Sequence, residues 1–136
     1  MSGVKNPVEA ARMVMEKSPH CFLQGPEATQ FAREYGLELC NDDYFITPHR
    51  VAQLGATQAV HEDAVVLDHA IDRKTNKMGT VGAVVRDDHG NLASASSTGG
   101  MCNKWSGRIG DTPCIGAGIY VNPHVAVACT GLLANI

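Results

Sequence analysis

The residues between Thr80 and Thr98 constrain the fold of this chain more than any other segment. The sequence TVGAVVR, from Thr80 to Arg86, alternates its side chains with the period of two that a β-strand requires. The turn sequence DDHG follows. Its glycine predicts a type I turn with a G1 bulge, in which the loop is Asp88 to Gly90. Because the chain then returns from Asn91 to Thr98, we predict an antiparallel hairpin.

The length of the loop predicts how the two strands pair. A loop flanked by Asp87 and Asn91 places Thr80 opposite Thr98, on the same face of the hairpin. Two hydroxyls then meet at the first residue of a strand, and a register shifted by one residue would separate them. We expect the other, apolar face of this strand to meet a second layer of the fold that this chain supplies only in part. It carries Val81, Ala83 and Val85.

The first half of the chain is predicted to be helical, because each of three segments has a proline near a helix start. The first helix has Asn6 as its N-cap and runs to about Lys17. Its apolar face is predicted from helical spacing to carry Val8, Ala11 and Met15.

Two further helices follow the same pattern. The second begins near Pro26 and ends at Gly36, where a glycine suits a helix C-terminus. The third begins at Pro48 after Thr47 as its N-cap, and we predict that Gly55 ends it.

From Ala56 to Gly79 the periodic signal fades, and we interpret this stretch as a linker. It contains a cluster of histidines and acids that a metal site would use. The spacing is not the HExxH of zinc enzymes, and nothing places both histidines on one face, so we predict no metal site. The cluster consists of His61, Glu62, Asp63, Asp68 and His69.

After the hairpin, a glycine-rich loop leads to two short predicted strands, Ile119 to Val121 and Val125 to Cys129. Together with the helices, these strands give a mixed α/β fold (α+β).

The chain has five cysteines, which is an odd number. They are widely spaced and form no CxxC pair, so we interpret them as reduced and mostly buried thiols.

Composition narrows the classes of function. The chain has 136 residues, of which 44% are hydrophobic, which suits one domain. A net charge of -3 with no basic block argues against nucleic-acid binding. No apolar run reaches membrane-spanning length and no signal-peptide pattern follows Met1, so we expect a cytoplasmic protein without a membrane partner.

Four motifs occur in order around the hairpin: GTVGAV from Gly79, STGG at the end of the second strand, GRxGD in the loop and a closing CTG. With the upstream stretch NPVEAARMVMEKSPH, they resemble the plant-type L-asparaginases, also called isoaspartyl peptidases, of the N-terminal nucleophile hydrolase superfamily. The resemblance implies an αββα sandwich and self-cleavage between Gly79 and Thr80. A glycine before the nucleophile favours this branch, because related glycosylasparaginases carry Asp there.

The resemblance implies that Thr80 becomes a new N-terminus and the nucleophile. The chemistry is sound by itself, because a threonine hydroxyl is a weak nucleophile that needs an adjacent base. A freed α-amino group titrates at about 7.7–8.0 and can accept the hydroxyl proton near neutral pH.

The resemblance implies roles for five other residues. Thr98 lies beside the nucleophile. Arg108 holds the α-carboxylate of the substrate, which suits a guanidinium fork, and Asp111 takes its α-ammonium group. Thr130 and Gly131 form the oxyanion hole. The implied substrate is L-asparagine or a β-aspartyl dipeptide, and no cofactor is expected.

The sequence also departs from the family pattern. The segment that holds a glycine-rich strand and the sodium-binding loop in the family has no counterpart here, and residues 132–136 do not match. We therefore expect a truncated member. Residues 1–79 would supply part of the α-subunit, with its linker at about 56–79, and residues 80–136 part of the β-subunit. Unpaired sheet edges would favour an oligomer of processed subunits.

Two alternatives stay open. The chain is either an active threonine amidohydrolase or a catalytically inactive truncated remnant that acts as a binding or assembly module. A weaker third hypothesis is a metal-binding regulator that uses the segment from His61 to His69.

Overall fold

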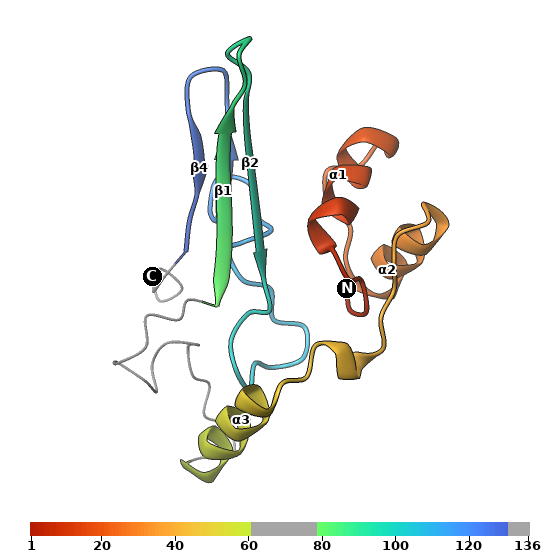
Figure 1. The fold of residues 1–136 in the computed structure, drawn as a ribbon, viewed down its shortest axis with the longest axis vertical. Coiled ribbons are helices and arrows are strands. Elements are labelled where there is room, and N and C mark those ends of the chain that lie inside the picture. The colour runs from red at the N-terminus through yellow and green to blue at the C-terminus, as the bar shows by residue number, and fades with distance from the viewer. Residues whose placement is uncertain (61–78, 131–136) are drawn as a thin grey trace. The chain divides into compact units, whose positions relative to one another are not determined.

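The structure of this protein is a computed structural model that describes residues 1–60 and 79–130 (Figure 1). The chain forms two compact units, an N-terminal unit, Met1–Val51, and a C-terminal unit that begins at Ala52. Helices and antiparallel strands are both present, so the predicted mixed α/β class is confirmed. Among the described helices, none combines the length and the apolarity that spanning a membrane requires.

The N-terminal unit packs two helices on a small apolar core. Helix α1 is Pro7–Lys17, α2 is Gly25–Glu34, and a single 3₁₀ turn, η1, is Asp42–Tyr44. An antiparallel bridge between Val4 and Leu39 closes the unit. The core brings together Val4, Ala10 and Ala32, with Leu37 and Leu39 packed against them.

The predicted apolar face of α1 is wrong. The buried residues are Ala10 and Val14, whereas Val8 and Met15 are 43% and 73% exposed and Ala11 is also exposed. Both sets have helical spacing, so the period alone does not choose between them. The choice is made by the bridge at Val4, which brings the Ala10 side of the helix to the core.

The helix ends follow local chemistry in part. Gly36 adopts a φ of +74°, and its N–H donates to the Arg33 carbonyl at 3.0 Å, so the predicted glycine C-terminus of α2 is confirmed. Asn6 occupies the N-cap position of α1 as predicted, but its side chain makes no capping hydrogen bond. The Glu9 N–H donates to the Asn6 backbone carbonyl instead, at 3.0 Å.

Helix α3, Pro48–Val60, is longer than predicted. Thr47 caps it as expected, since its Oγ1 accepts the Arg50 N–H at 3.3 Å. Gly55 does not end the helix, because one glycine costs about 1 kcal/mol and a segment rich in alanine follows without a proline. The predicted linker therefore does not begin at Ala56. Residues 61–78, with the cluster from His61 to His69, lie outside the described residues.

The predicted hairpin and its register are confirmed. Strand β1 is Thr80–Arg86 and β2 is Leu92–Thr98, and they pair antiparallel from Thr80 opposite Thr98 to Arg86 opposite Leu92. The turn is also as predicted. The Gly90 N–H donates to the Asp87 carbonyl at 3.1 Å, with Gly90 at a φ of +87°.

Asp87 organises this turn with its side chain. Its carboxylate accepts the Asn91 side-chain N–H at 2.7 Å, the Asn91 backbone N–H at 2.7 Å and the His89 N–H at 3.0 Å. These hydrogen bonds, the Asn91 side chain foremost, lower the pKa of Asp87.

A pH dependence of the turn follows. Because the folded pKa of Asp87 lies below the value in an unfolded chain, its stabilisation is full above about pH 4 and is lost as the pH falls through the folded pKa. The protection of the His89 and Asn91 amides, relative to an unstructured peptide at the same pH, should therefore fall in acid, and Asp87→Asn should remove this pH dependence. Asp88→Asn is the matched control, since Asp88 is exposed and its Oδ1 lies 3.9 Å from His89 Nε2. An unchanged acid profile in the Asp87 variant would contradict the assignment.

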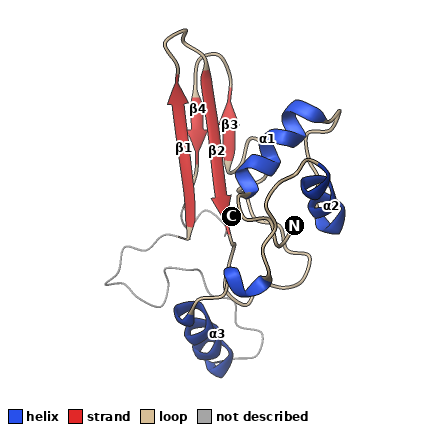
Figure 2. Ribbon diagram, turned by 45° about the vertical axis from the view of Figure 1, so that its right-hand side comes forward, coloured by secondary structure: helices blue, strands red, loops and turns tan. Residues whose placement is uncertain are grey.

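A second, shorter hairpin lies against the first. It consists of β3, Ile119–Val121, and β4, Ala126–Ala128, which pair antiparallel (Figure 2). The Ser94 hydroxyl donates to the Val127 carbonyl at 2.8 Å, which links β2 to β4. The predicted strand from Val125 to Cys129 is confirmed with slightly shorter bounds.

The face of β1 that packs on the second hairpin is the one that carries Gly82, and the face predicted to meet a layer that this chain supplies only in part stays exposed. Gly82 faces β4, so a Cβ atom on it would lie 2.8 Å from the Cβ of Ala128. Val81 and Val85, on the other face, are 66% and 61% exposed, and Ala83 is exposed as well. The physical reason is size, because a glycine and the small side chains opposite it let a second backbone approach closely.

Candidate active site

The site begins with two threonines at the open end of the β1–β2 hairpin. Thr80 is the first residue of β1 and Thr98 the last of β2. The Thr80 hydroxyl donates to the Thr98 hydroxyl oxygen, with the two Oγ1 atoms 2.9 Å apart. The cross-strand register produces this contact, because opposite residues of an antiparallel pair project from the same face.

Thr98 accepts a second hydrogen bond at the same oxygen. The Gly100 backbone N–H donates to Thr98 Oγ1 at 3.0 Å. With one acceptor position taken by Gly100, the Thr98 oxygen has a defined direction for the Thr80 proton. The arrangement leaves the lone pairs of Thr80 Oγ1 free to attack a carbonyl carbon. Gly79, which is half-buried, is the residue directly before Thr80 in the chain.

A third threonine comes from the end of the second hairpin. The Thr130 hydroxyl donates to the Thr80 backbone carbonyl at 3.3 Å. Strand β4 ends two residues earlier, at Ala128, and its packing against β1 carries Thr130 to this position. Gly131, its predicted partner in an oxyanion hole, lies outside the described residues.

Arg108 and Asp111 lie in the loop between β2 and β3. The guanidinium of Arg108 lies beside Gly100 and Gly110, whose Cβ positions would be 3.5 and 3.3 Å from Nη1. Both residues are half-buried. Their side chains form no ion pair with each other in the described part of the chain.

The backbone around Asp111 holds this part of the loop in place. Its carbonyl accepts the Cys114 N–H at 2.8 Å and the Gly118 N–H at 3.1 Å. Gly118 is buried, and a Cβ atom on it would lie 2.5 Å from the Asp111 carbonyl oxygen. Sequence reasoning missed Gly118, although its place in the motif GAG just before β3 is a signal of close backbone approach.

The cysteines are free thiols but are less buried than predicted. Cys21 is exposed, and the other four are only half-buried. The loops that carry them lie at the surface of their units, which explains the difference. In residues 1–60 and 79–130, no group of three metal-ligating side chains is placed to hold an ion.

Gly82 is expected to set the distance between the two hairpins. In Gly82→Ala the new methyl group would press on Ala128, so we expect a loss of about 1–3 kcal/mol in the free energy of unfolding, as for other overpacked sites. Denaturant unfolding measures this loss. Gly55→Ala is the control, because its Cβ would enter open space within a helix. It should be neutral or stabilising by up to about 1 kcal/mol. Equal losses in both variants would contradict the role of Gly82.

The described residues thus bring two threonine hydroxyls together at the open end of one hairpin. Residues 1–133 match the asparaginase family, and the chain belongs to that family.

The similar curated proteins carry the names of two related activities. The chain is 53% identical over 135 residues to the isoaspartyl peptidase of Salmonella typhimurium, covering 96% of this chain and 42% of the relative. It is 43% identical over 129 residues to the isoaspartyl peptidase/L-asparaginase of Danio rerio, covering 94% of this chain and 40% of the relative. The chain thus spans about two fifths of the length of these relatives.

Proposed function

We propose that this chain carries the nucleophile of a threonine amidohydrolase that activates itself by cleaving the Gly79–Thr80 bond. The activated protein would then hydrolyse L-asparagine and β-aspartyl dipeptides, the activities named in its relatives. The observation that carries the proposal is the contact between Thr80 Oγ1 and Thr98 Oγ1 at the first residue of β1.

Self-cleavage needs a hydroxyl next to a carbonyl. Thr80 Oγ1 attacks the carbonyl carbon of Gly79, and the hydroxyl proton leaves toward Thr98. The peptide C–N bond breaks as the Thr80 nitrogen takes up a proton, and an ester between Gly79 and the Thr80 oxygen results. One water molecule hydrolyses this ester, which releases the Gly79 carboxylate and leaves Thr80 with a free α-amino group and hydroxyl.

The same hydroxyl would act in the second reaction. The free α-amino group of Thr80 accepts the hydroxyl proton, and its distance from the hydroxyl is fixed by covalent geometry. Attack on the side-chain amide of the substrate gives an acyl-threonine and expels ammonia or an amino acid. A water molecule then releases aspartate.

Recognition is assigned to the loop after β2 and to the end of β4. Arg108 would take the α-carboxylate of the substrate in a bidentate contact, and Asp111 its α-ammonium group. Thr130 would turn its hydroxyl from the Thr80 carbonyl to the developing oxyanion, with the Gly131 N–H as the second donor.

The proposal extends to assembly and location. Cleavage would give one fragment of residues 1–79 and another of residues 80–136, and these would form an oligomer of processed subunits. We place the protein in the cytoplasm, acting on a small molecule and not on nucleic acid or a membrane. A net charge of -3 supports this choice of ligand class.

An observation also favours a second function, that of a binding or assembly module. The outer face of β1 leaves Val81 and Val85 more than half exposed, as a surface that meets another protein would. Such a module would need no chemistry at Thr80.

The test follows the fate of the Gly79–Thr80 bond. Purified protein is incubated at neutral pH, and its intact mass and N-terminal sequences are recorded over time. The proposal expects two fragments whose masses add up to the precursor plus one water, with threonine as the new N-terminus. A chain that stays intact while it binds a partner protein would support the assembly module instead.

A further inference from the structure

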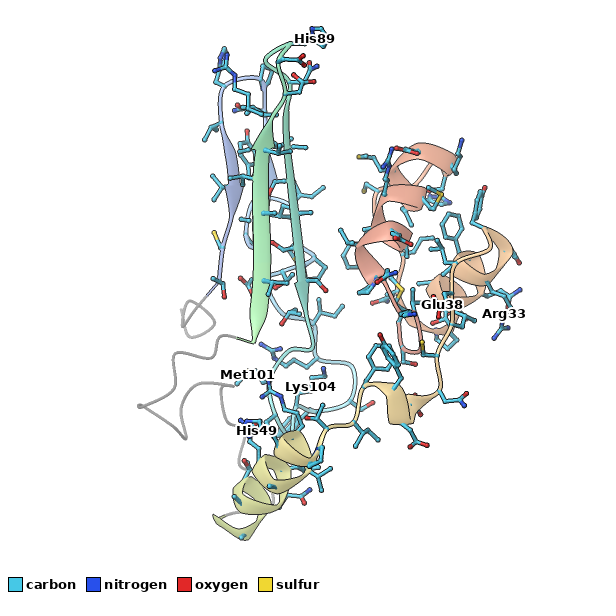
Figure 3. The ribbon with its side chains drawn as sticks, in the orientation of Figure 1. Arg33, Glu38, His49, His89, Met101 and Lys104 are labelled. Atoms are coloured by element: carbon cyan, nitrogen blue, oxygen red, sulfur yellow. The ribbon has the colours of Figure 1, made fainter. Side chains whose placement is uncertain are left out.

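The loop after β2 doubles back on its own beginning. Gly100 has a φ of +81° and Asn103 a φ of +55°, so both residues adopt the left-handed range of φ, which turns the chain. As a result, the Lys104 ammonium group reaches the backbone carbonyl of Gly99 and donates a hydrogen bond to it. Figure 3 shows Lys104 beyond the end of β2 that carries Thr98.

The carbonyl that Lys104 binds belongs to the Gly99–Gly100 peptide, and the N–H of the same peptide donates a hydrogen bond to the Thr98 hydroxyl oxygen. The Gly99 C=O and the Gly100 N–H are the two polar groups of one planar peptide. Lys104 binds the first group, and the second donates to Thr98 Oγ1 at 3.0 Å. Fixing the direction of the carbonyl therefore fixes the direction of the N–H on its opposite side.

This peptide is one that would rotate easily without a tether. It joins two glycines, and glycine has access to positive and negative φ at little cost. A cation on the carbonyl also polarises the peptide and strengthens its N–H as a donor. Lys104 therefore holds the peptide in the one orientation that serves Thr98.

We propose that Lys104 is a positioning residue that orients the Thr98 hydroxyl through the Gly99–Gly100 peptide. With one acceptor position of Thr98 Oγ1 held by the Gly100 N–H, the other accepts the Thr80 hydroxyl at 2.9 Å. This inference rests on the proposed function, because the orientation matters when Thr80 gives up its proton.

Lys104 is also near the residue assigned to the substrate carboxylate. A Cβ atom on Gly100 would lie 3.1 Å from Lys104 Nζ and 3.5 Å from Arg108 Nη1, so both cations border the same point. A direct role of Lys104 in carboxylate binding would change KM. A positioning role changes kcat and self-cleavage, which needs no carboxylate at all.

The experiment compares Lys104→Met with Lys104→Arg in the full chain. Methionine keeps the apolar stem and removes the donor, whereas arginine keeps a cationic donor. In Lys104→Met we expect Gly100 amide exchange to accelerate about tenfold or more and self-cleavage to slow by a similar factor, as befits a lost bond to a charged group. Lys104→Arg should restore most of the protection of the Gly100 amide and most of the rate of self-cleavage. Lys17→Met, at an exposed lysine in the last turn of α1, should change neither.

Amide exchange at His89 and Asn91, in the turn at the far end of the hairpin, reports whether each variant is folded (Figure 3). Unchanged Gly100 exchange in a folded Lys104→Met variant would overturn the inference, as would a change in KM alone. A wild-type chain that never cleaves would refute the proposed function, and the Gly100 exchange would still decide whether Lys104 fixes the peptide.

Discussion

Alanine in place of Thr80 is expected to abolish self-cleavage and hydrolysis together. The substitution removes the hydroxyl that donates to Thr98 and that the proposed mechanism uses in both reactions. Intact mass should show only the uncleaved chain after prolonged incubation. Release of ammonia from L-asparagine should fall to the level of a blank.

Two variants keep this result interpretable. Thr80→Ser retains a hydroxyl on the same backbone atom and should retain part of the self-cleavage. Ser97→Ala removes the neighbouring hydroxyl on the opposite face of β2, where it pairs with Val81, and should cleave like the wild type. Cleavage at Gly79–Thr80 in a Thr80→Ala variant would show that another group cuts the bond.

Arg108→Ala is expected to separate the two reactions. Loss of a bidentate, charge-assisted contact with the substrate carboxylate should cost about 2–4 kcal/mol, or about 30- to 1,000-fold in kcat/KM. Self-cleavage should survive, because the Gly79 carbonyl needs no recognition of an amino-acid head group. Steady-state kinetics on a chain that has already cleaved measures kcat/KM, and mass spectrometry measures the extent of self-cleavage.

Arg108→Lys is the matched variant for this measurement. It keeps the charge and loses the planar fork, so its kcat/KM should lie between those of the wild type and the alanine variant. If Arg108→Ala also stopped self-cleavage, the residue would have to support the fold of the loop around Gly100 and Gly110. Its assignment to the substrate carboxylate would then be wrong.

The pairing of Thr80 with Thr98 could be predicted from sequence because local chemistry decides it. A glycine at the end of the turn selects the loop, and the loop selects the register. The end of α3 could not be predicted in the same way, since Gly55 has only a weak preference against helix and the neighbouring residues override it.

The remaining features depend on contacts between segments far apart in the chain. Which face of α1 is buried depends on Val4 and its bridge to Leu39, and which face of β1 meets a second layer depends on the approach of Ala128 to Gly82. The return of Lys104 to Gly99 depends on the left-handed conformation of Asn103. Periodicity and spacing carry no information on these contacts, so only the structure reveals them.

The turn from Asp87 to Asn91 has a consequence for how the length of this protein can change. Exposed hairpin tips ordinarily accept insertions and deletions, because little is packed around them. This tip lies about 20 Å from Thr80 by the rise of the strand, yet its length helps determine which residue stands opposite Thr80. If one residue were removed there and the strands kept a three-residue loop, the register would shift by one and the Thr98 hydroxyl would turn to the other side of the sheet. A part of the molecule that is open to solvent and remote from Thr80 therefore constrains the pairing at Thr80.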